Sequence, residues 1–168
     1  MLDSLITSKT RLRLLVKFFL NIANKGYLNG LANEFGESTN SVRKELNNLS
    51  SAGYLEKFSE NNKVVYKANA HHPLFKIIQK VVKKHLGIEE ILQTVLKRIG
   101  EVKKIMILGD YAEGIDSGHI EILIVGDNIS EVYLKEISLK IEKKINRKVS
   151  FFVSNSTLKQ KTLTIFEA

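Results

Sequence analysis

The sequence predicts an α+β protein made of two folded domains and a helical connector, and three patterns point to this class. Apolar residues recur at helical spacing over residues 10–53 and are followed by two short β-type runs. A single amphipathic pattern covers residues 73–99. Residues 102–155 then follow the order strand, glycine loop, strand, helix and strand, which makes a small α/β unit. The domains that we predict are residues 1–72 and 99–168, with the connector at residues 73–98.

The composition excludes several classes of protein. With 168 residues and 43% hydrophobic content, the chain can bury one solid core or two small ones. It contains no cysteine, so neither a disulfide framework nor a thiolate metal site can form. The N-terminus does not look like an export signal, and no long uncharged apolar run is present. We therefore expect a cytoplasmic protein that does not enter a membrane.

The net charge of +8 is concentrated in the first part of the chain. Residues 1–72 contain ten Lys and Arg against six Asp and Glu, and residues 73–98 contain six against two. Residues 99–168 are balanced at ten against ten. This asymmetry favours a polyanionic partner for the N-terminal part. A generally soluble basic surface would explain the same charge without any partner, and charge alone does not separate the two explanations.

Three helices joined by tight turns are expected in the first domain. Dense apolar residues over positions 10–23 predict a buried helix that is ended by Gly26. A shorter helical segment follows in residues 27–36. The third helix begins at Ser38, which suits an N-cap, and runs until Gly53 supplies a C-terminal cap.

A β-hairpin is expected after the third helix. Two β-type runs, residues 54–58 and 64–70, flank the polar sequence Ser-Glu-Asn-Asn-Lys, which suits a turn. Three helices followed by a hairpin is the layout of a winged helix-turn-helix domain. The second and third helices also have the spacing that a helix-turn-helix needs to present its second helix in a groove of DNA.

The outward face of the third helix has the chemistry of a DNA contact. Arg can bind guanine through two hydrogen bonds, Asn can bind adenine, and Ser, Thr and Lys can hold phosphate oxygens. A lone helix with such a face would more often be an ordinary solvated surface, but the helix-turn-helix spacing, the hairpin and the local charge favour DNA binding. The residues off the apolar stripe are Thr39, Asn40, Ser41, Arg43, Lys44, Asn47 and Asn48.

The hairpin offers a second set of candidate contacts. Its residues could reach phosphates or an adjacent minor groove, and a solvated turn without any ligand is an equally good interpretation. The residues concerned are Lys57, Asn61, Asn62 and Lys63.

Residues 8–70 resemble the small winged-helix transcription regulators of the ArsR-like and MarR-like groups. The resemblance rests on residues 31–69 and on the exit from the third helix, where Ala52-Gly53-Tyr54-Leu55 matches the pattern between recognition helix and wing. It implies a DNA-binding role for the positions that match that helix and wing. The metal-sensing branch of these regulators uses cysteines, which this chain lacks.

The connector is predicted to be one long helix, or two helices broken at Gly87. His71 and His72 precede Pro73, which suits the first position of a helix; without a carboxylate or Cys at ligand spacing, the two histidines favour a linker over a zinc site. The other face of the connector is basic, but only Phe75 could anchor it to a membrane or a partner protein. Winged-helix regulators usually read two half-sites, so we predict a homodimer with this segment as a possible seam.

The second domain resembles the minimal nucleotidyltransferases over about residues 99–160. Their motif has Gly-Ser, a short Ala-Arg-Gly loop, and Ser-Asp-x-Asp on a strand, with a third acidic residue on a later strand. Residues 109–127, Gly-Asp-Tyr-Ala-Glu-Gly-Ile-Asp-Ser-Gly-His-Ile-Glu-Ile-Leu-Ile-Val-Gly-Asp, match the frame of this motif. Gly109 falls on its first glycine and Gly114 on the glycine of its loop.

The residues that such a transfer needs are mostly replaced. In the family, two carboxylates on one strand face hold two Mg²⁺ ions. Here the first position is His119 and only the second, Glu121, is acidic. The motif serine becomes Asp110, the loop arginine becomes Glu113, and the third carboxylate position falls on Ser150; the two acids add negative charge where a triphosphate would lie.

We therefore expect a non-catalytic domain without a cofactor, used for sensing, dimerisation or partner binding, including a protein or nucleotide ligand. The alternative is an active but divergent Mg²⁺-dependent nucleotidyltransferase attached to a DNA-binding module. An unconventional metal site made of Asp110, Asp116 and Glu121 follows no known ligand spacing and is the less favoured form of that alternative.

Overall fold

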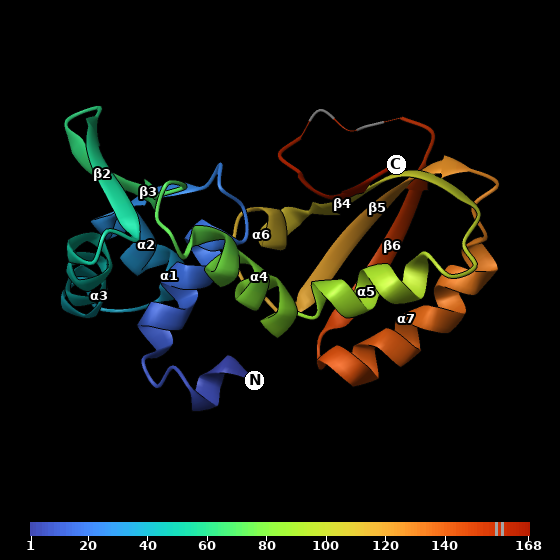
Figure 1. Cartoon of the computed structure of the whole chain (residues 1–168), viewed down its shortest axis with the longest axis horizontal. Coiled ribbons are helices and arrows are strands. Elements are labelled where there is room, and N and C mark those ends of the chain that lie inside the picture. The colour runs from blue at the N-terminus through green and yellow to red at the C-terminus, as the bar shows by residue number, and fades with distance from the viewer. Residues whose placement is uncertain (157, 159) are drawn as a thin grey trace. The chain divides into compact units, whose positions relative to one another are not determined.

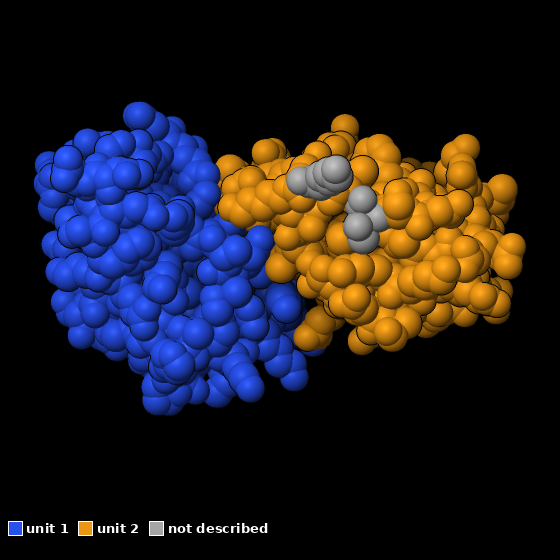
Figure 2. All heavy atoms as spheres, turned by 90° about the horizontal axis from the view of Figure 1, so that it is seen from above, with its two compact units in different colours: residues 1–85 blue, residues 86–168 orange. Residues whose placement is uncertain are grey.

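The computed structural model describes residues 1–156, 158 and 160–168, and within them the chain forms seven α-helices and two β-sheets. This agrees with the α+β class predicted from the sequence. Residues 1–85 and residues 86–168 form two separate units (Figure 2). None of the described helices is long and apolar enough to span a membrane.

The first unit contains four α-helices and a three-stranded sheet, together with a short 3-10 helix at Leu2–Ser4. The strands are antiparallel, in the order β1-β3-β2. Its elements are α1 (Lys9–Phe19), β1 (Lys25–Tyr27), α2 (Leu28–Phe35), α3 (Thr39–Ser51), β2 (Leu55–Glu60), β3 (Lys63–Ala68) and α4 (Phe75–His85) (Figure 1).

The ends of these helices agree only in part with the sequence prediction. Ser38 is the N-cap of α3, as predicted, and its Oγ accepts a hydrogen bond of 3.2 Å from the Ser41 amide. The first helix ends at Phe19, so the prediction that it continues to Gly26 is wrong. Strand β1 lies in between and was not predicted, because it is three residues long and its hydrogen bonds come from β3, with Gly26 paired to Tyr66.

The predicted hairpin is present with a shorter turn than expected. Strands β2 and β3 pair in regular antiparallel register up to Glu60 opposite Lys63. Only Asn61 and Asn62 lie between these two residues, and both have positive φ, at 49° and 60°. Two consecutive residues in this conformation make the tight turn whose twist matches that of the strands, and Asn adopts it more readily than most residues.

A buried carboxylate joins α3 to the start of α1. Glu45 is 6% exposed, and its two oxygens accept hydrogen bonds from Arg11 Nε at 2.7 Å and Ser8 Oγ at 3.0 Å. Ser8 is also the N-cap of α1. Burial by itself would raise the pKa of Glu45, but the bonds from Arg11 and Ser8 outweigh this effect, so its pKa lies below the ordinary value.

The apolar core of the first unit is formed by residues that include Leu14, Phe18, Leu31, Val42, Leu46 and Leu49.

The connector forms two helices, the second of the two arrangements that the sequence allowed. The first, α4, begins at Phe75 rather than at Pro73, and the ring of Phe75 packs against Phe19 of α1 with 5.6 Å between centroids. Gly87 separates α4 from α5, and its φ of 80° lies in the region that favours glycine. A Cβ on Gly87 would lie 2.4 Å from Ile145 Cγ2. The predicted connector is therefore divided, with α4 in the first unit and α5 in the second.

The second unit is a four-stranded sheet with helices on one face. The strand order is β6-β5-β4-β7; β5 and β6 are parallel, and the other neighbours are antiparallel. Helices α5 and α7 lie side by side against the sheet, joined by a hydrogen bond of 2.7 Å from Tyr133 Oη to the Thr94 carbonyl (Figure 1). The elements are α5 (Ile88–Val95), β4 (Glu101–Leu108), α6 (Gly109–Ala112), β5 (His119–Asp127), α7 (Glu131–Ile145), β6 (Lys148–Ser154) and β7 (Leu163–Glu167).

Two elements of this unit were not predicted. The glycine loop after β4 begins with the one-turn helix α6, and the chain returns at the end to add β7 beside β4. Both are short, and β7 obtains its hydrogen bonds from a strand about 60 residues earlier, as the pairing of Ile107 with Leu163 shows. A pattern of five residues is too short to distinguish a strand from a loop.

Replacing Glu45 with Gln should destabilise the first unit in a pH-dependent way. Because the pKa of Glu45 is lower in the folded chain than in the unfolded one, its charge stabilises the fold above the ordinary carboxyl pKa, and this contribution is lost as the pH falls through the folded-state value. We expect E45Q to lose about 1–2 kcal/mol of unfolding free energy at about pH 7 and to approach the wild type near about pH 3.

Urea unfolding followed by circular dichroism at both pH values measures this effect. Glu56→Gln is the matched control, because the pair of Glu56 with Lys67 is exposed at 3.7 Å and such surface pairs contribute about 0–1 kcal/mol. A loss in E45Q that is the same at both pH values would contradict the role assigned to its charge.

Candidate functional site

The exposed face of α3 contains every residue that the sequence proposed for it. Thr39, Asn40, Ser41, Arg43, Lys44, Asn47 and Asn48 are all exposed, whereas Val42, Leu46 and Leu49 are buried. The buried Glu45 lies on the inner side with these apolar residues, so its pairing holds α3 in this rotation. The polar face therefore projects into solvent along the length of the helix.

Hydrogen bonds within α3 orient part of this face. Asn40 Oδ1 accepts a bond of 3.1 Å from Arg43 Nη1, one turn further along the helix. Ser38 Oγ and Ser41 Oγ lie 2.9 Å apart and share a hydrogen bond. The guanidinium of Arg43 retains further N–H donors for a ligand, because it has five in all.

A groove runs between α3 and the edge of the small sheet. Its volume is about 410 Å³. Arg43 and Asn47 from α3 and Lys63 from β3 lie on its walls, so the structure brings three of the predicted residues to one concave surface. The Lys63 ammonium lies 4.0 Å from the centre of the Tyr27 ring, which holds it at the groove by a cation–π contact. The remaining lining residues are Tyr27, Leu28, Asn29, Leu46, Val64 and Tyr66.

The other hairpin residues lie outside the groove. Asn61 and Asn62 form the tip of the hairpin, where both are exposed. Lys57 is exposed on β2 and pairs in register with Tyr66, but it does not line the groove. Sequence reasoning missed Tyr27 and Tyr66 as parts of this surface. An aromatic residue beside a basic one is a signal for nucleic-acid binding, but Tyr27 meets Lys63 only through the pairing of β1 with β3.

The acidic residues of the first unit are all engaged in ion pairs, and two of these pairs, those of Glu56 and Glu60, lie on the small sheet itself. Asp3 pairs with the N-terminal ammonium at 3.2 Å. The five glutamates pair with five of the ten basic residues in positions 1–72. These pairs are Glu34 with Lys17, Glu37 with Arg13, Glu45 with Arg11, Glu56 with Lys67 and Glu60 with Lys25.

Of the five basic residues in positions 1–72 that remain, four lie on α3 and the hairpin, and helix α4 of the same unit adds four lysines. Within residues 1–85, all of which the structure describes, no carboxylate forms an ion pair with Arg43, Lys44, Lys57 or Lys63. Lys9, at the start of α1, is the only other such residue in positions 1–72. The excess positive charge of these 72 residues is therefore concentrated on the surface formed by α3 and the hairpin, where solvated cations attract polyanions.

The two histidines before Pro73 have structural surroundings. The His72 ring stacks on Tyr54 with 4.3 Å between centroids, and its Nδ1 accepts a hydrogen bond of 3.1 Å from the Leu74 amide. Among the described residues, no group of three His, Asp or Glu side chains is placed to hold a metal ion.

In the second unit, the residues of the nucleotidyltransferase-like motif surround an open cavity of about 700 Å³. Gly109, Asp110, Glu113 and Glu121 line it, together with apolar residues of β4, β5 and β6. His119 and Ser150 lie on the neighbouring strands β5 and β6, with 2.7 Å between His119 Nε2 and Ser150 Oγ. The described walls thus contain three carboxylates and the ammonium of Lys161, which pairs with Glu113 at 2.8 Å.

Asp116 connects three parts of the second unit. It accepts hydrogen bonds from the Tyr111 hydroxyl and, at 2.8 and 2.6 Å, from Nε and Nη2 of Arg147. Burial, strengthened by Asp116, raises the pKa of Tyr111 above its ordinary value, so the phenol stays a donor. The bond to Asp116 likewise raises the pKa of Arg147. Asp116 therefore fixes the loop before β5 to the chain between α7 and β6, and in the described part of the chain it does not form a metal-holding group with Asp110 and Glu121.

Comparisons with known proteins do not assign the chain to a family. No protein-family model matches it, and no curated protein matches it significantly in sequence. The crystal structure of Sso10a-2, described as a DNA-binding protein from Sulfolobus solfataricus, overlaps with 50% of this chain and 85% of its own. The two share 18% identity with a TM-score of 0.35, which does not establish a common fold.

Replacing Gly109 with Ala should destabilise the second unit through Glu121. The φ of Gly109 is 59°, and a Cβ there would lie 2.3 Å from Glu121 Oε2. We expect G109A to cost about 1–2 kcal/mol, of which about 1 kcal/mol is backbone strain that remains in any background and the rest comes from displacing the Glu121 carboxylate. Adding Glu121→Ala removes the clash, so the double variant should be more stable than the sum of the single effects predicts. Thermal unfolding of the wild type, G109A, E121A and the double variant measures this coupling. Additive losses of stability would show that Glu121 does not pack over Gly109.

Proposed function

We propose that residues 1–72 are a winged helix-turn-helix domain that binds double-stranded DNA. In this proposal α3 enters the major groove and the β2–β3 hairpin lies against the backbone beside it. The observation that carries the proposal is the distribution of ion pairs. All the carboxylates of this region are paired with other cations, which leaves Arg43 and Lys44 on α3 and Lys57 and Lys63 on the hairpin without an ion-pair partner among the described residues.

The geometry of the surface suggests a role for each kind of residue. Arg43 and Asn47 lie one turn apart on α3 and line the groove, so we assign them to base edges, with Asn40 orienting Arg43. Thr39, Ser41 and Lys44 flank them on the exposed face, and we assign these to phosphate oxygens.

The hairpin supplies contacts beside the helix. Lys63 is held at the groove by Tyr27, so its ammonium is positioned before DNA arrives. Lys57 and the turn residues Asn61 and Asn62 are exposed and are assigned to backbone or minor-groove contacts. The protein would act as a transcription regulator, and its second unit would sense a signal, form a dimer or bind a partner.

We further propose that the second unit does not transfer nucleotides. Support comes from the side chains at the motif positions: His119 is hydrogen-bonded to Ser150, and Glu113 is paired with Lys161. Asp116, which an unconventional metal site would need, is held by Arg147 and Tyr111. Asp110 and Glu121 face the same cavity, and their charge opposes that of a triphosphate.

Removing the cations of α3 should weaken DNA binding. We expect Arg43→Ala with Lys44→Ala to lower the affinity for a random duplex at least about tenfold, and to reduce the slope of log K against log salt by about 1–2. Fluorescence anisotropy over a series of salt concentrations measures both quantities.

The matched control is Lys25→Ala with Lys67→Ala, which removes the same formal charge from residues that are already paired with Glu60 and Glu56. The affinity of this control for the duplex should stay within about threefold of the wild-type affinity, because the net charge is reduced but the α3 surface is intact. Absence of binding at low salt, or equal losses in both double variants, would overturn the proposed interface.

The proposal that the second unit is non-catalytic has a direct test. Incubated with Mg²⁺ and labelled nucleoside triphosphates, the full chain should transfer no label to itself or to nucleic-acid acceptors. Transfer that Glu121→Ala abolishes would instead establish the alternative, an active but divergent nucleotidyltransferase attached to a DNA-binding module.

A further inference from the structure

Strand β6 ends the sheet of the second unit, and among the described residues no strand pairs with its outer edge. The direction of its backbone groups follows from a hydrogen bond of its first residue, Lys148. The Lys148 amide donates to the Gly118 carbonyl at 2.8 Å, on the side of β5. Because N–H and C=O groups alternate in direction along a strand, Val149, Phe151 and Val153 direct theirs away from β5.

One of these outward groups is already satisfied. The Val149 amide donates to Glu142 Oε1 of α7 at 2.9 Å, so this end of the edge is closed by a side chain of the same unit. The amides and carbonyls of Phe151 and Val153 have no such partner among the described residues. Two outward-facing residues separated by one other residue are what an antiparallel strand needs to form four hydrogen bonds around that middle residue. Here the middle residue is Phe152.

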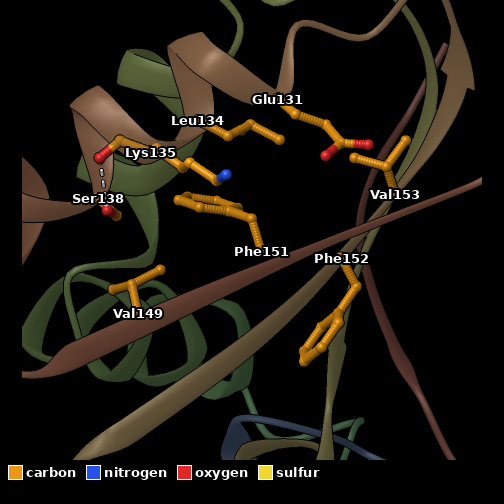
Figure 3. A pocket seen from close by; sticks show the side chains of 8 residues that line it. All are labelled: Glu131, Leu134, Lys135, Ser138, Val149, Phe151, Phe152 and Val153. Carbon is orange, nitrogen blue, oxygen red and sulfur yellow. Dashed lines mark hydrogen bonds between the residues drawn. The ribbon is translucent and has the colours of Figure 1, made fainter.

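A groove beside this edge has apolar walls and opposite charges. It has a volume of about 310 Å³ and lies between α7 and β6 (Figure 3). In Figure 3, Phe151 points toward α7, whereas Phe152 points to the opposite side of the strand. Glu131 and Lys135, one turn apart on α7, line the same groove.

Large apolar side chains of β6 and α7, the two elements that form the groove, are exposed. Phe152 is 46% exposed, and on α7 Val132 is 71% and Leu139 is 64% exposed. Val132 and Leu139 are seven residues apart and therefore lie on one side of α7. Of these residues, Phe152 lies on the open edge strand itself. An open strand edge with exposed apolar side chains is found where another chain adds to a sheet.

We propose that β6 pairs with β6 of a second copy of this chain, antiparallel and around a two-fold axis at Phe152. Phe151 of one copy would exchange both backbone hydrogen bonds with the partner's Val153, and Val153 with the partner's Phe151. The two sheets would become one, with α7 antiparallel to its counterpart on the same face. In Figure 3, Glu131 lies beside Val153 and Lys135 lies beside Phe151. Because the axis places Val153 opposite the partner's Phe151, it also brings Glu131 level with the partner's Lys135, and their charges are opposite.

The opposite edge of the sheet is less suited to this role. Strand β7 has five residues, and its register with β4 shifts between Ile105 and Met106. Short and irregular edge strands are a common protection against further pairing. Strand β6 has seven residues in unbroken register with β5, contains no proline, and has its only charged residue, Lys148, at its start.

A second copy fits this edge better than an unrelated strand. The open backbone groups are symmetric about Phe152, and the charges of Glu131 and Lys135 complement each other when α7 meets itself in the opposite direction. A two-fold interface requires such self-complementarity. The inference does not depend on DNA binding; if both hold, the dimer brings two α3 helices to one DNA molecule, as half-site recognition requires.

The absence of cysteine from the chain makes this register directly testable. Residues opposite each other at the axis of a non-hydrogen-bonded pair have Cα atoms about 4.5 Å apart, within the range of a disulfide. Phe152→Cys alone should therefore form a covalent dimer under mild oxidation. Ser150→Cys alone should not, because the two copies of Ser150 would be offset by about 13 Å along the strands. A mixture of S150C and S154C proteins should cross-link, since these positions face each other across the axis.

Sedimentation equilibrium of the wild type in the absence of DNA should give twice the mass of one chain. Val153→Pro removes an outward amide while leaving the bonds to β5 intact, so it should keep the fold and weaken dimerisation at least about tenfold. Val153→Ala is the matched control and should dimerise nearly as well as the wild type. A monomeric wild type, or a dimer in which F152C does not cross-link and V153P has no effect, would overturn the inference. Neither result bears on whether α3 binds DNA.

Discussion

The buried Glu45 is the contact on which the proposed use of α3 depends. It lies on the inner side of the helix with Val42 and Leu46, and Arg11 and Ser8 hold it against the start of α1. A carboxylate at 6% exposure would be costly without those donors, so the helix cannot turn without losing them. The rotation that satisfies Glu45 directs Arg43, Lys44 and Asn47 into solvent. It also keeps the charge of Glu45 paired with Arg11 beneath the helix.

Carboxylates hold the second unit together in a similar way. Asp116 connects Tyr111 and Arg147, and Glu142 closes the amide of Val149 at the edge of the sheet. The carboxylate of Glu121 lies over Gly109, where a Cβ would displace it. Asp116 lies in the loop whose sequence has the frame of a catalytic motif, Glu121 lies on the strand that follows it, and Glu142 lies on α7.

The two units use their sheets differently. In the first, the hairpin ends in a tight Asn61-Asn62 turn and its glutamates are paired with lysines of the same sheet, so Lys57 and Lys63 are the charged residues of β2 and β3 that have no ion-pair partner within residues 1–85. In the second, β6 presents an open edge with apolar neighbours and few charges. Charged strands resist pairing with other chains, and an uncharged edge promotes it. This contrast agrees with the two proposals, in which the first sheet contacts a polyanion and the second contacts protein.

Features that depend on neighbouring residues could be predicted from the sequence, and features that depend on distant partners could not. Ser38 caps α3, the two asparagines form the turn, and Gly87 divides the connector, because each of these requires only the local backbone and a side chain. The sequence also determined which residues of α3 are exposed, since Val42, Leu46 and Leu49 mark the buried side.

Strands β1 and β7 were missed because their hydrogen bonds come from residues far along the chain. The choice of partner for each glutamate belongs to the tertiary structure for the same reason: Glu45 meets Arg11 across 34 positions, and no spacing rule connects them. Composition alone determined that positive charge is in excess, and only the fold decided that it remains on α3 and the hairpin, because ion pairing is a matter of distance in space.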